Sequence, residues 1–159
     1  MKRTTLLLTL IVALLSGCQS VSSFYRGKTV AAEQVIPIAG TAKGEEWKTF
    51  DLTINFDYGE EGEFFAIGGE VALSEHYRMN YEWLRDLDIL LLFLDNRLQV
   101  IEAAYLVRGG GHGTDATMPF SLKLPIPEQA AAFSFAYEGF AIAGDDKPGS
   151  PSFFWLRPK

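Results

Sequence analysis

Cys18 is the only cysteine of the 159-residue chain, and the residues before it specify what chemistry its thiol undergoes. A basic pair, Lys2 and Arg3, precedes residues 6–15, which are apolar except for one threonine. A basic start, a short apolar stretch and small residues before a cleavage point are typical of a secretory signal peptide. At about 1.5 Å per residue the apolar stretch reaches roughly 15 Å, half of a bilayer's hydrocarbon core. We therefore expect residues 1–17 to be a signal peptide rather than a membrane span.

A lone cysteine in an exported chain has no intramolecular disulfide partner, so it needs another role. The stretch Leu15-Ser16-Gly17-Cys18 resembles a bacterial lipobox, whose pattern is leucine, a small residue, glycine or alanine, and cysteine. The resemblance implies cleavage between Gly17 and Cys18, a diacylglycerol on the Cys18 sulfur and acylation of the freed α-amine. Several acyl chains hold a protein stably on a membrane. In such lipoproteins an aspartate after the cysteine favours the inner membrane, so Gln19 implies the outer membrane, facing the periplasm.

The two histidines, His76 and His112, are 36 residues apart, and no ligand motif joins them to a metal site. His112 sits in a glycine run at 109–113. A Walker motif needs a lysine after such glycines, and a dinucleotide fingerprint needs a following helix; neither is present. There is also no Gly-x-Ser-x-Gly elbow for a nucleophile. We expect a surface loop at 109–113 that could contact a partner, with no cofactor, no metal and no enzymatic activity.

Two further groups of side chains could bind ligands. Acidic residues gather around the turn at 57–63, where they could ligate Ca²⁺, although the EF-hand order is absent and a solvated turn is favoured. The chain has three tryptophans and six tyrosines, most of which a small domain needs for its core. The candidate interaction surface is an irregular segment together with the glycine run, and consists of Tyr81, Trp83, Arg85 and His112.

Composition narrows the class of protein. Residues 18–159 suffice for one domain, and with Lys2 and Arg3 removed they hold 12 basic and 20 acidic residues, a formal charge of −8. Such a domain is repelled by phosphate backbones, so we expect no nucleic acid partner. An aromatic content of 13% predicts a packed core rather than a disordered linker. We expect residues 18–30, which are serine-rich, to be a tether and residues 31–159 to be a single domain.

Period-two patterns predict strands throughout that domain. The cleanest pattern covers 47–58, and 64–73 returns after a turn to form an antiparallel hairpin. The residues expected on the buried face of the first strand are Phe50, Leu52, Ile54, Phe56 and Tyr58. Gly68-Gly69 inside the second strand predicts a bulge or a close backbone approach.

A nearly continuous apolar run at 87–94 predicts a central strand covered on both faces. A polar turn and the run at 98–107 complete a second hairpin. Further strands are expected at 30–38, 120–124, 132–142 and 152–156. Ser74 could cap a helix, and we expect at most one short helix around 75–85.

Seven or eight strands with at most one short helix predict an all-β fold, an antiparallel two-sheet sandwich of immunoglobulin-like or transthyretin-like type, with a barrel as the alternative. The runs 93–95 and 133–139 resemble those of small envelope lipoproteins of unassigned function. The gross plan is similar to that of the outer-membrane lipoprotein of type VI secretion systems, at the level of the fold alone. We expect a non-enzymatic module of the bacterial cell envelope, anchored through Cys18, that binds another envelope protein. The alternative is a lipoprotein that binds a sugar, peptide or lipid on an aromatic patch.

Overall fold

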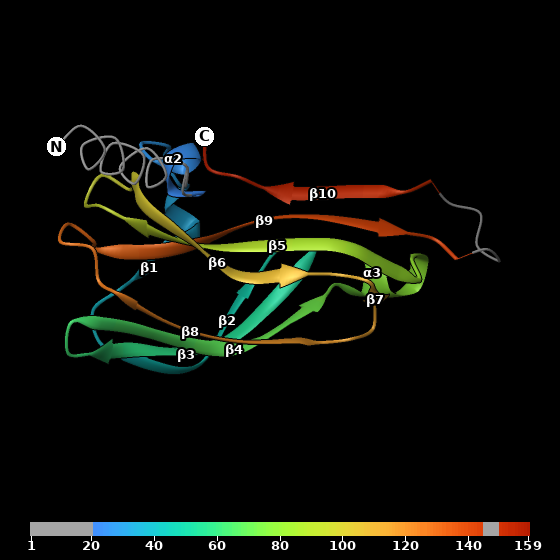
Figure 1. Ribbon diagram of the computed structural model, residues 1–159, viewed down its shortest axis with the longest axis horizontal. Coiled ribbons are helices and arrows are strands. Elements are labelled where there is room, and N and C mark those ends of the chain that lie inside the picture. The colour runs from blue at the N-terminus through green and yellow to red at the C-terminus, as the bar shows by residue number, and fades with distance from the viewer. Residues whose placement is uncertain (1–20, 145–149) are drawn as a thin grey trace, which may run out of the picture.

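The computed structural model describes residues 21–144 and 150–159. Within them ten strands form two antiparallel sheets that face each other (Figure 1). One sheet has the order β1-β9-β5-β6, with β10 also paired to β9 and β7 also paired to β5; the other has the order β2-β3-β4-β8. The predicted all-β, two-sheet sandwich is therefore confirmed.

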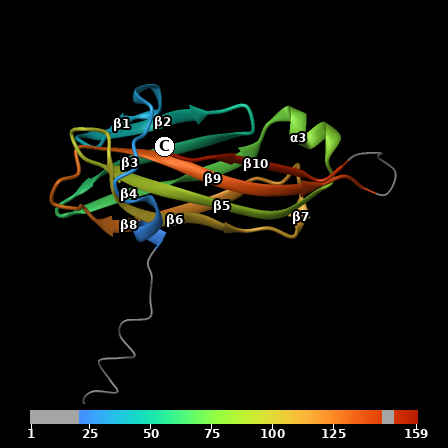
Figure 2. The same ribbon diagram turned by 90° about the horizontal axis from the view of Figure 1, so that it is seen from above.

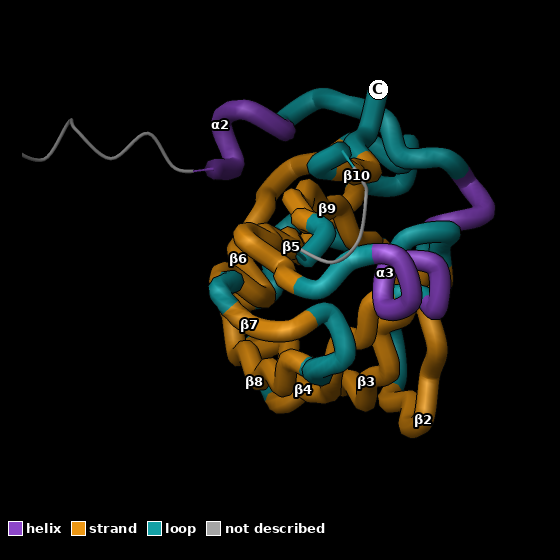
Figure 3. The backbone as a smooth tube through the Cα atoms, turned by 90° about the vertical axis from the view of Figure 1, so that its right-hand side faces the viewer, coloured by secondary structure: helices purple, strands orange, loops and turns teal. Residues whose placement is uncertain are grey.

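The bounds of the elements are as follows. The strands are β1 (Ile36–Pro37), β2 (Thr41–Lys48), β3 (Leu52–Glu61), β4 (Phe64–Leu73), β5 (Trp83–Leu94), β6 (Val100–Gly109), β7 (His112–Gly113), β8 (Met118–Pro125), β9 (Ala132–Ile142) and β10 (Ser152–Leu156). The helices are α2 (Val21–Tyr25), the 3-10 turn η1 (Ala32–Gln34) and α3 (Glu75–Asn80). The helix expected around 75–85 is α3. A second short helix, α2, was not expected; it lies on the opposite side of the sandwich (Figure 3).

The segment 47–58, expected to be one strand, contains a turn between β2 and β3. Thr49 Oγ1 accepts the backbone N–H groups of Asp51 and Leu52, each at 3.2 Å, which closes the turn. Phe50, expected to be buried, lies at the turn with 74% of its surface exposed. The apolar alternation continued across the turn, so periodicity alone did not show that the chain reverses there. This turn and the two-residue β7 raise the strand number above the predicted seven or eight.

The glycine pair in β4 marks a close backbone approach rather than a bulge. Strands β3 and β4 pair without a register shift from end to end. A Cβ atom on Gly69 would lie 2.0 Å from the backbone oxygen of Asn55, whereas one on Gly68 would have no atom nearer than 3.6 Å. Only glycine therefore fits at position 69 without moving a strand.

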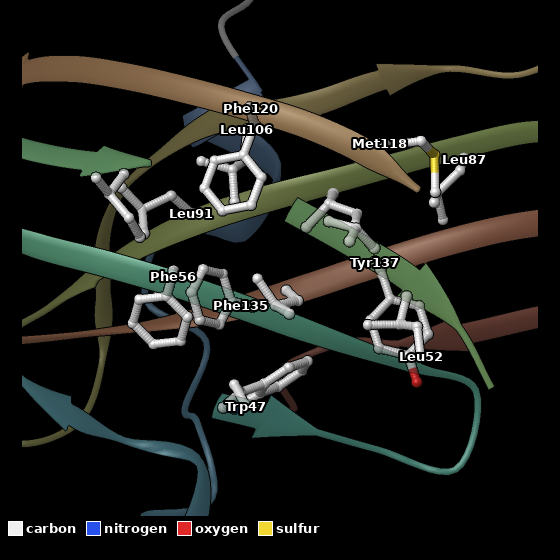
Figure 4. Packing of buried hydrophobic residues seen from close by; sticks show 14 of the residues in the cluster. Trp47, Leu52, Phe56, Leu87, Leu91, Leu106, Met118, Phe120, Phe135 and Tyr137 are labelled. Atoms are coloured by element: carbon white, nitrogen blue, oxygen red, sulfur yellow. The ribbon is translucent and has the colours of Figure 1, made fainter. Parts of the chain in front are cut away.

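The main core lies between the sheets and is rich in aromatic rings (Figure 4). Trp47 of β2 contacts Phe135 and Tyr137 of β9, with ring centroids 5.2 Å and 6.3 Å apart. The buried Tyr137 hydroxyl donates to Asp51 Oδ2 at 2.6 Å and lies within hydrogen-bond distance of Thr49 Oγ1, at 2.9 Å. These contacts connect the β2–β3 turn of one sheet to strand β9 of the other.

The apolar part of β5, residues 89–94, is buried on both faces, as the apolar run of the sequence predicted. Its outward-facing Leu90 and Leu92 belong to a second core cluster, which includes Tyr25 of α2 and the following Val30. An apolar sheet face needs cover to leave water, and here the cover comes from residues before the first strand. The segment that contains Tyr25 and Val30 therefore belongs to the folded domain.

The description of 18–30 as a tether needs correction, because its described part, from Val21 onward, is folded against β6 (Figure 2). Ser22 Oγ donates to the Ala103 carbonyl at 2.8 Å and accepts the Ala103 N–H at 2.9 Å. Lys28 accepts the N–H of Val100 at 2.8 Å. These bonds satisfy backbone groups that the edge of β6 would otherwise leave unpaired.

Candidate binding groove

The outer face of the six-stranded sheet is covered by α2 over only part of its area. Beyond the helix a groove of about 640 Å³ crosses β6, β5, β9 and β10. The alternation of β5 shows where the cover ends, because its outward side chains change from carboxylates at Asp86 and Asp88 to leucines at Leu90 and Leu92. The polar part of the face forms the groove, and the apolar part lies under α2.

Strand pairing arranges the first row of groove side chains. Asp88 of β5 is paired with Arg108 of β6 and Glu138 of β9, and Glu138 is paired in turn with Trp155 of β10. Arg108 Nε lies 3.6 Å from Asp88 Oδ1, and the Arg157 guanidinium pairs with Glu138. The row ends at Trp155, whose surface is 63% exposed. Both carboxylates of this row are thus matched by an arginine.

The second row lies two residues further along the strands, about 7 Å away. It consists of Asp86 of β5, Phe140 of β9 and Phe153 of β10. The two phenylalanine rings stack with centroids 4.3 Å apart and an interplanar angle of 13°, and Phe153 is 67% exposed. Asp86 is exposed and makes no ion pair or hydrogen bond with the described part of the chain. This row therefore offers a flat apolar surface beside an unpaired carboxylate.

The charges of the groove do not balance. Burial raises the pKa of Asp88, Arg108 lowers it, and the neighbouring carboxylates of Glu138 and Asp86 raise it again. The net direction is upward despite the ion pair with Arg108. Three carboxylates and two arginines line the groove, so its charged side chains leave one negative charge that a cation could balance.

The groove continues toward the N-terminal helix. A second cavity of about 260 Å³ lies between α2 and the sheet and shares Asp88, Glu138 and Arg157 with the groove. Val21 and Phe24 of α2 line its other side. One end of the groove is therefore bordered by the described residue nearest to Cys18 in sequence.

The candidate surface expected from the sequence lies at the far end of the same sheet. Trp83 opens β5, is 45% exposed and faces outward with Phe140, since it pairs with Ile142. His112 in β7 is paired with Leu84, the residue after Trp83. The structure thus brings Trp83 and His112 onto neighbouring strands.

The other two expected residues, like Trp83 and His112, do not line the groove. Tyr81 is half-buried and stacks on Tyr77 with a centroid distance of 5.3 Å. Arg85 is exposed at a bulge between Leu84 and Asp86. The sequence predicted the strands β9 and β10 but did not predict that their outward-facing side chains line a groove.

The glycine run at 109–113, expected to be a flexible loop, extends the sheet. Gly109 ends β6, and the Gly111 N–H donates to the Leu84 carbonyl at 2.7 Å. A Cβ atom on Gly110 would lie 2.1 Å from the backbone oxygen of Arg85. These glycines therefore allow close backbone packing against β5.

The remaining candidates are scattered. His76 is exposed in α3, and the His112 Nδ1 atom lies 3.0 Å from the Gly113 carbonyl oxygen. In the acidic turn Asp57 accepts the Gly44 N–H at 2.7 Å, and Glu61 pairs with a lysine of β8. Across residues 21–144 and 150–159, no three His, Cys, Asp or Glu side chains are arranged to hold a metal ion.

Cys18 and Gly17, the expected lipidation and cleavage positions, lie outside the described residues. Within the described part, no helix combines the length and apolar character needed to cross a bilayer. No protein-family model matches the sequence, and neither a curated protein nor a solved structure matches the chain.

Proposed function

We propose that this protein is a non-enzymatic lipoprotein of the bacterial cell envelope that binds an envelope protein through the groove on the outer face of its six-stranded sheet. The observation that carries the proposal is the pair of exposed aromatic side chains, Phe153 and Trp155, beside the groove. Neighbouring exposed aromatic residues are costly in water and mark interaction sites. Tryptophan is also the residue type most enriched among side chains that dominate binding energy.

The proposed anchor is a lipid on Cys18, on the strength of the lipobox resemblance, and Gln19 favours the outer membrane facing the periplasm. This placement fits the position of the groove, which begins beside α2. The domain's acidic charge argues against a nucleic acid partner. The proposal therefore joins two surfaces close together, a membrane attachment and a protein-binding groove.

The partner is tested by photo-crosslinking in living cells. A photoreactive phenylalanine analogue replaces Trp155, and the matched control replaces Phe50, which is even more exposed but belongs to the turn between β2 and β3. We expect a discrete adduct with one envelope protein from position 155 and none from position 50. Absence of an adduct at 155, or the same adduct from both positions, contradicts the proposal.

The anchor is tested separately with Cys18→Ser. We expect the variant to keep its signal peptide, to incorporate no labelled fatty acid and to leave the membrane fraction on mild extraction. Normal processing and membrane partitioning of this variant would refute the lipobox assignment.

A second candidate is a small-ligand-binding lipoprotein. It is favoured by the volume of the groove, about 640 Å³, which falls in the range of roughly 300–1,000 Å³ typical of ligand pockets. Native mass spectrometry of the detergent-purified protein separates the two. A bound small molecule, together with no crosslinked protein at position 155, would replace the first candidate by the second.

A further inference from the structure

Three carboxylates face the groove, and only two of them have an arginine. Asp88 is paired with Arg108, and Glu138 is paired with Arg157. Asp86 faces the same groove without an ionic partner in the described part of the chain. A binding partner could therefore supply a third cation without displacing an existing one.

The protein itself shows how an arginine is held on this face. Arg108 pairs with Asp88 and at the same time lies over the ring of Tyr105, with 4.4 Å from the guanidinium carbon to the ring centroid. Guanidinium groups are suited to this double contact, because they are planar, stack on aromatic faces and pair with carboxylates through several N–H donors.

The second row of the groove also combines a carboxylate with aromatic rings, but it has no arginine. Asp86 is directly opposite Phe140 across β5 and β9, and Phe140 stacks on Phe153 of β10. An arginine side chain lying along the two rings would cover exposed apolar surface with its stem and bring its guanidinium to Asp86. The groove has one carboxylate more than it has arginines, and this net negative charge would attract the cationic side chain.

We infer that the groove binds an arginine side chain of the partner protein, with its guanidinium on the Asp86 carboxylate and its stem on the stacked rings of Phe140 and Phe153. This inference rests on the proposed function and names the chemistry that its partner must present. It commits to a segment of the partner with an accessible arginine, because charge complementarity and the Arg108 contact both select that group.

The test uses the detergent-purified lipoprotein and three pentapeptides that differ only at the central residue, which is arginine, lysine or citrulline. Citrulline keeps the shape of arginine and removes its charge. Binding is followed by NMR through the indole N–H signals of the three tryptophans. The signals lost in Trp155→Phe and in Trp47→Phe identify those of Trp155 and Trp47. We expect the arginine peptide to shift the Trp155 signal saturably and to leave the buried Trp47 unchanged.

The variants separate a local contact from general attraction to an acidic protein. Asp86→Asn should weaken arginine-peptide binding about tenfold, the value of one lost charge-assisted hydrogen bond. Glu60→Gln makes the same charge change at the exposed β3–β4 hairpin and should alter the affinity less than twofold. Phe153→Ala should also weaken binding, since it removes half of the aromatic stack.

Each other outcome overturns the inference. Citrulline binding as tightly as arginine would exclude the ionic contact, and lysine binding as tightly would show that the groove does not select a guanidinium group. Equal effects of Asp86→Asn and Glu60→Gln would show only long-range attraction. An adduct from position 155 in cells, combined with an unshifted Trp155 signal, would reject the arginine and leave the proposed function standing.

Discussion

The close approach of β3 and β4 at Gly69 gives a stability prediction with a control in the neighbouring residue. In Gly69→Ala the new Cβ atom would start 2.0 Å from the Asn55 backbone oxygen, and ordinary contact begins at 3.4 Å. The two strands must therefore separate locally by more than 1 Å. Because the obstructing atom belongs to the backbone of a central strand, no side-chain rotation can relieve the overlap.

The expected cost follows from these contacts. Overpacking typically costs about 1–3 kcal/mol, and stretching the adjacent ladder would weaken backbone hydrogen bonds worth about 1 kcal/mol each. Alanine also lowers the conformational entropy of the unfolded chain, which stabilises the protein by about 0.4–1 kcal/mol and offsets part of this cost. The free energy of unfolding should thus fall by roughly 3 kcal/mol, which lowers Tm by roughly 10 °C for a domain of this size.

Urea unfolding followed by tryptophan fluorescence measures the effect. Gly68→Ala is the control, since its Cβ atom would meet nothing nearer than 3.6 Å; it should be as stable as the natural chain or up to about 1 kcal/mol more stable. If Gly69→Ala lies within about 0.5 kcal/mol of Gly68→Ala, the close approach of the two strands is wrong.

Three further predictions concern the groove, the core and the N-terminal segment. Gly139→Ala should destabilise the protein by about 1–2 kcal/mol and weaken arginine-peptide binding, because its Cβ atom would lie 2.2 Å from the Phe154 ring that supports β10; Gly109→Ala, with open space around it, should leave the stability unchanged. Tyr137→Phe should cost about 1–3 kcal/mol at neutral pH through two lost hydrogen bonds. Burial raises the pKa of Tyr137 above 10.0, so the hydroxyl contributes fully to the free energy of unfolding below pH 10, and this contribution is lost as the pH rises further. Between pH 8 and pH 11 the free energy of unfolding should therefore fall less in Tyr137→Phe than in the natural chain. Ser22→Ala should lower the free energy of unfolding by about 1–2 kcal/mol in the same urea assay, and an unchanged value would mean that α2 adds nothing to the fold.

The sheets could be predicted from the sequence because one-sided burial imposes a period of two. Leu52, Ile54 and Phe56 follow that period and are all buried. Phe50 follows it equally well and is exposed, because the period does not record a reversal of the chain at a tight turn. Periodicity therefore identified the strands but not all of their ends.

The role of the N-terminal segment could have been inferred only by asking what covers β5. A strand that is apolar on both faces requires a second covering layer, and Leu90 and Leu92 had none among the predicted strands. The short α2 has little periodicity of its own, and Tyr25 is its main buried anchor. The sequence therefore indicated that a second layer must cover β5, but it did not indicate which segment forms that layer.

The groove was harder to predict, since its residues come from four strands whose register is set by tertiary pairing. The run Phe153-Phe154-Trp155 is aromatic throughout, so alternation cannot tell which residue faces inward; Phe154 is buried and its neighbours are exposed. One signal was present. Asp86 and Asp88 alternate with buried residues at the start of an otherwise apolar strand, which marks the place where the outer cover stops.

If Cys18 carries the proposed lipid, the hydrogen bonds that hold α2 to β6 determine the height of the groove above the bilayer. Cys18 is three residues from Val21, a distance of about 10 Å at full extension. A lipid on Cys18 would therefore keep the domain from swinging freely and would fix one border of the groove in the layer next to the headgroups. The groove would then meet partners that are held at the same membrane surface, where their effective concentration is high. Under this arrangement an arginine close to the membrane surface reaches Asp86, and the same arginine on a domain held far above the surface does not.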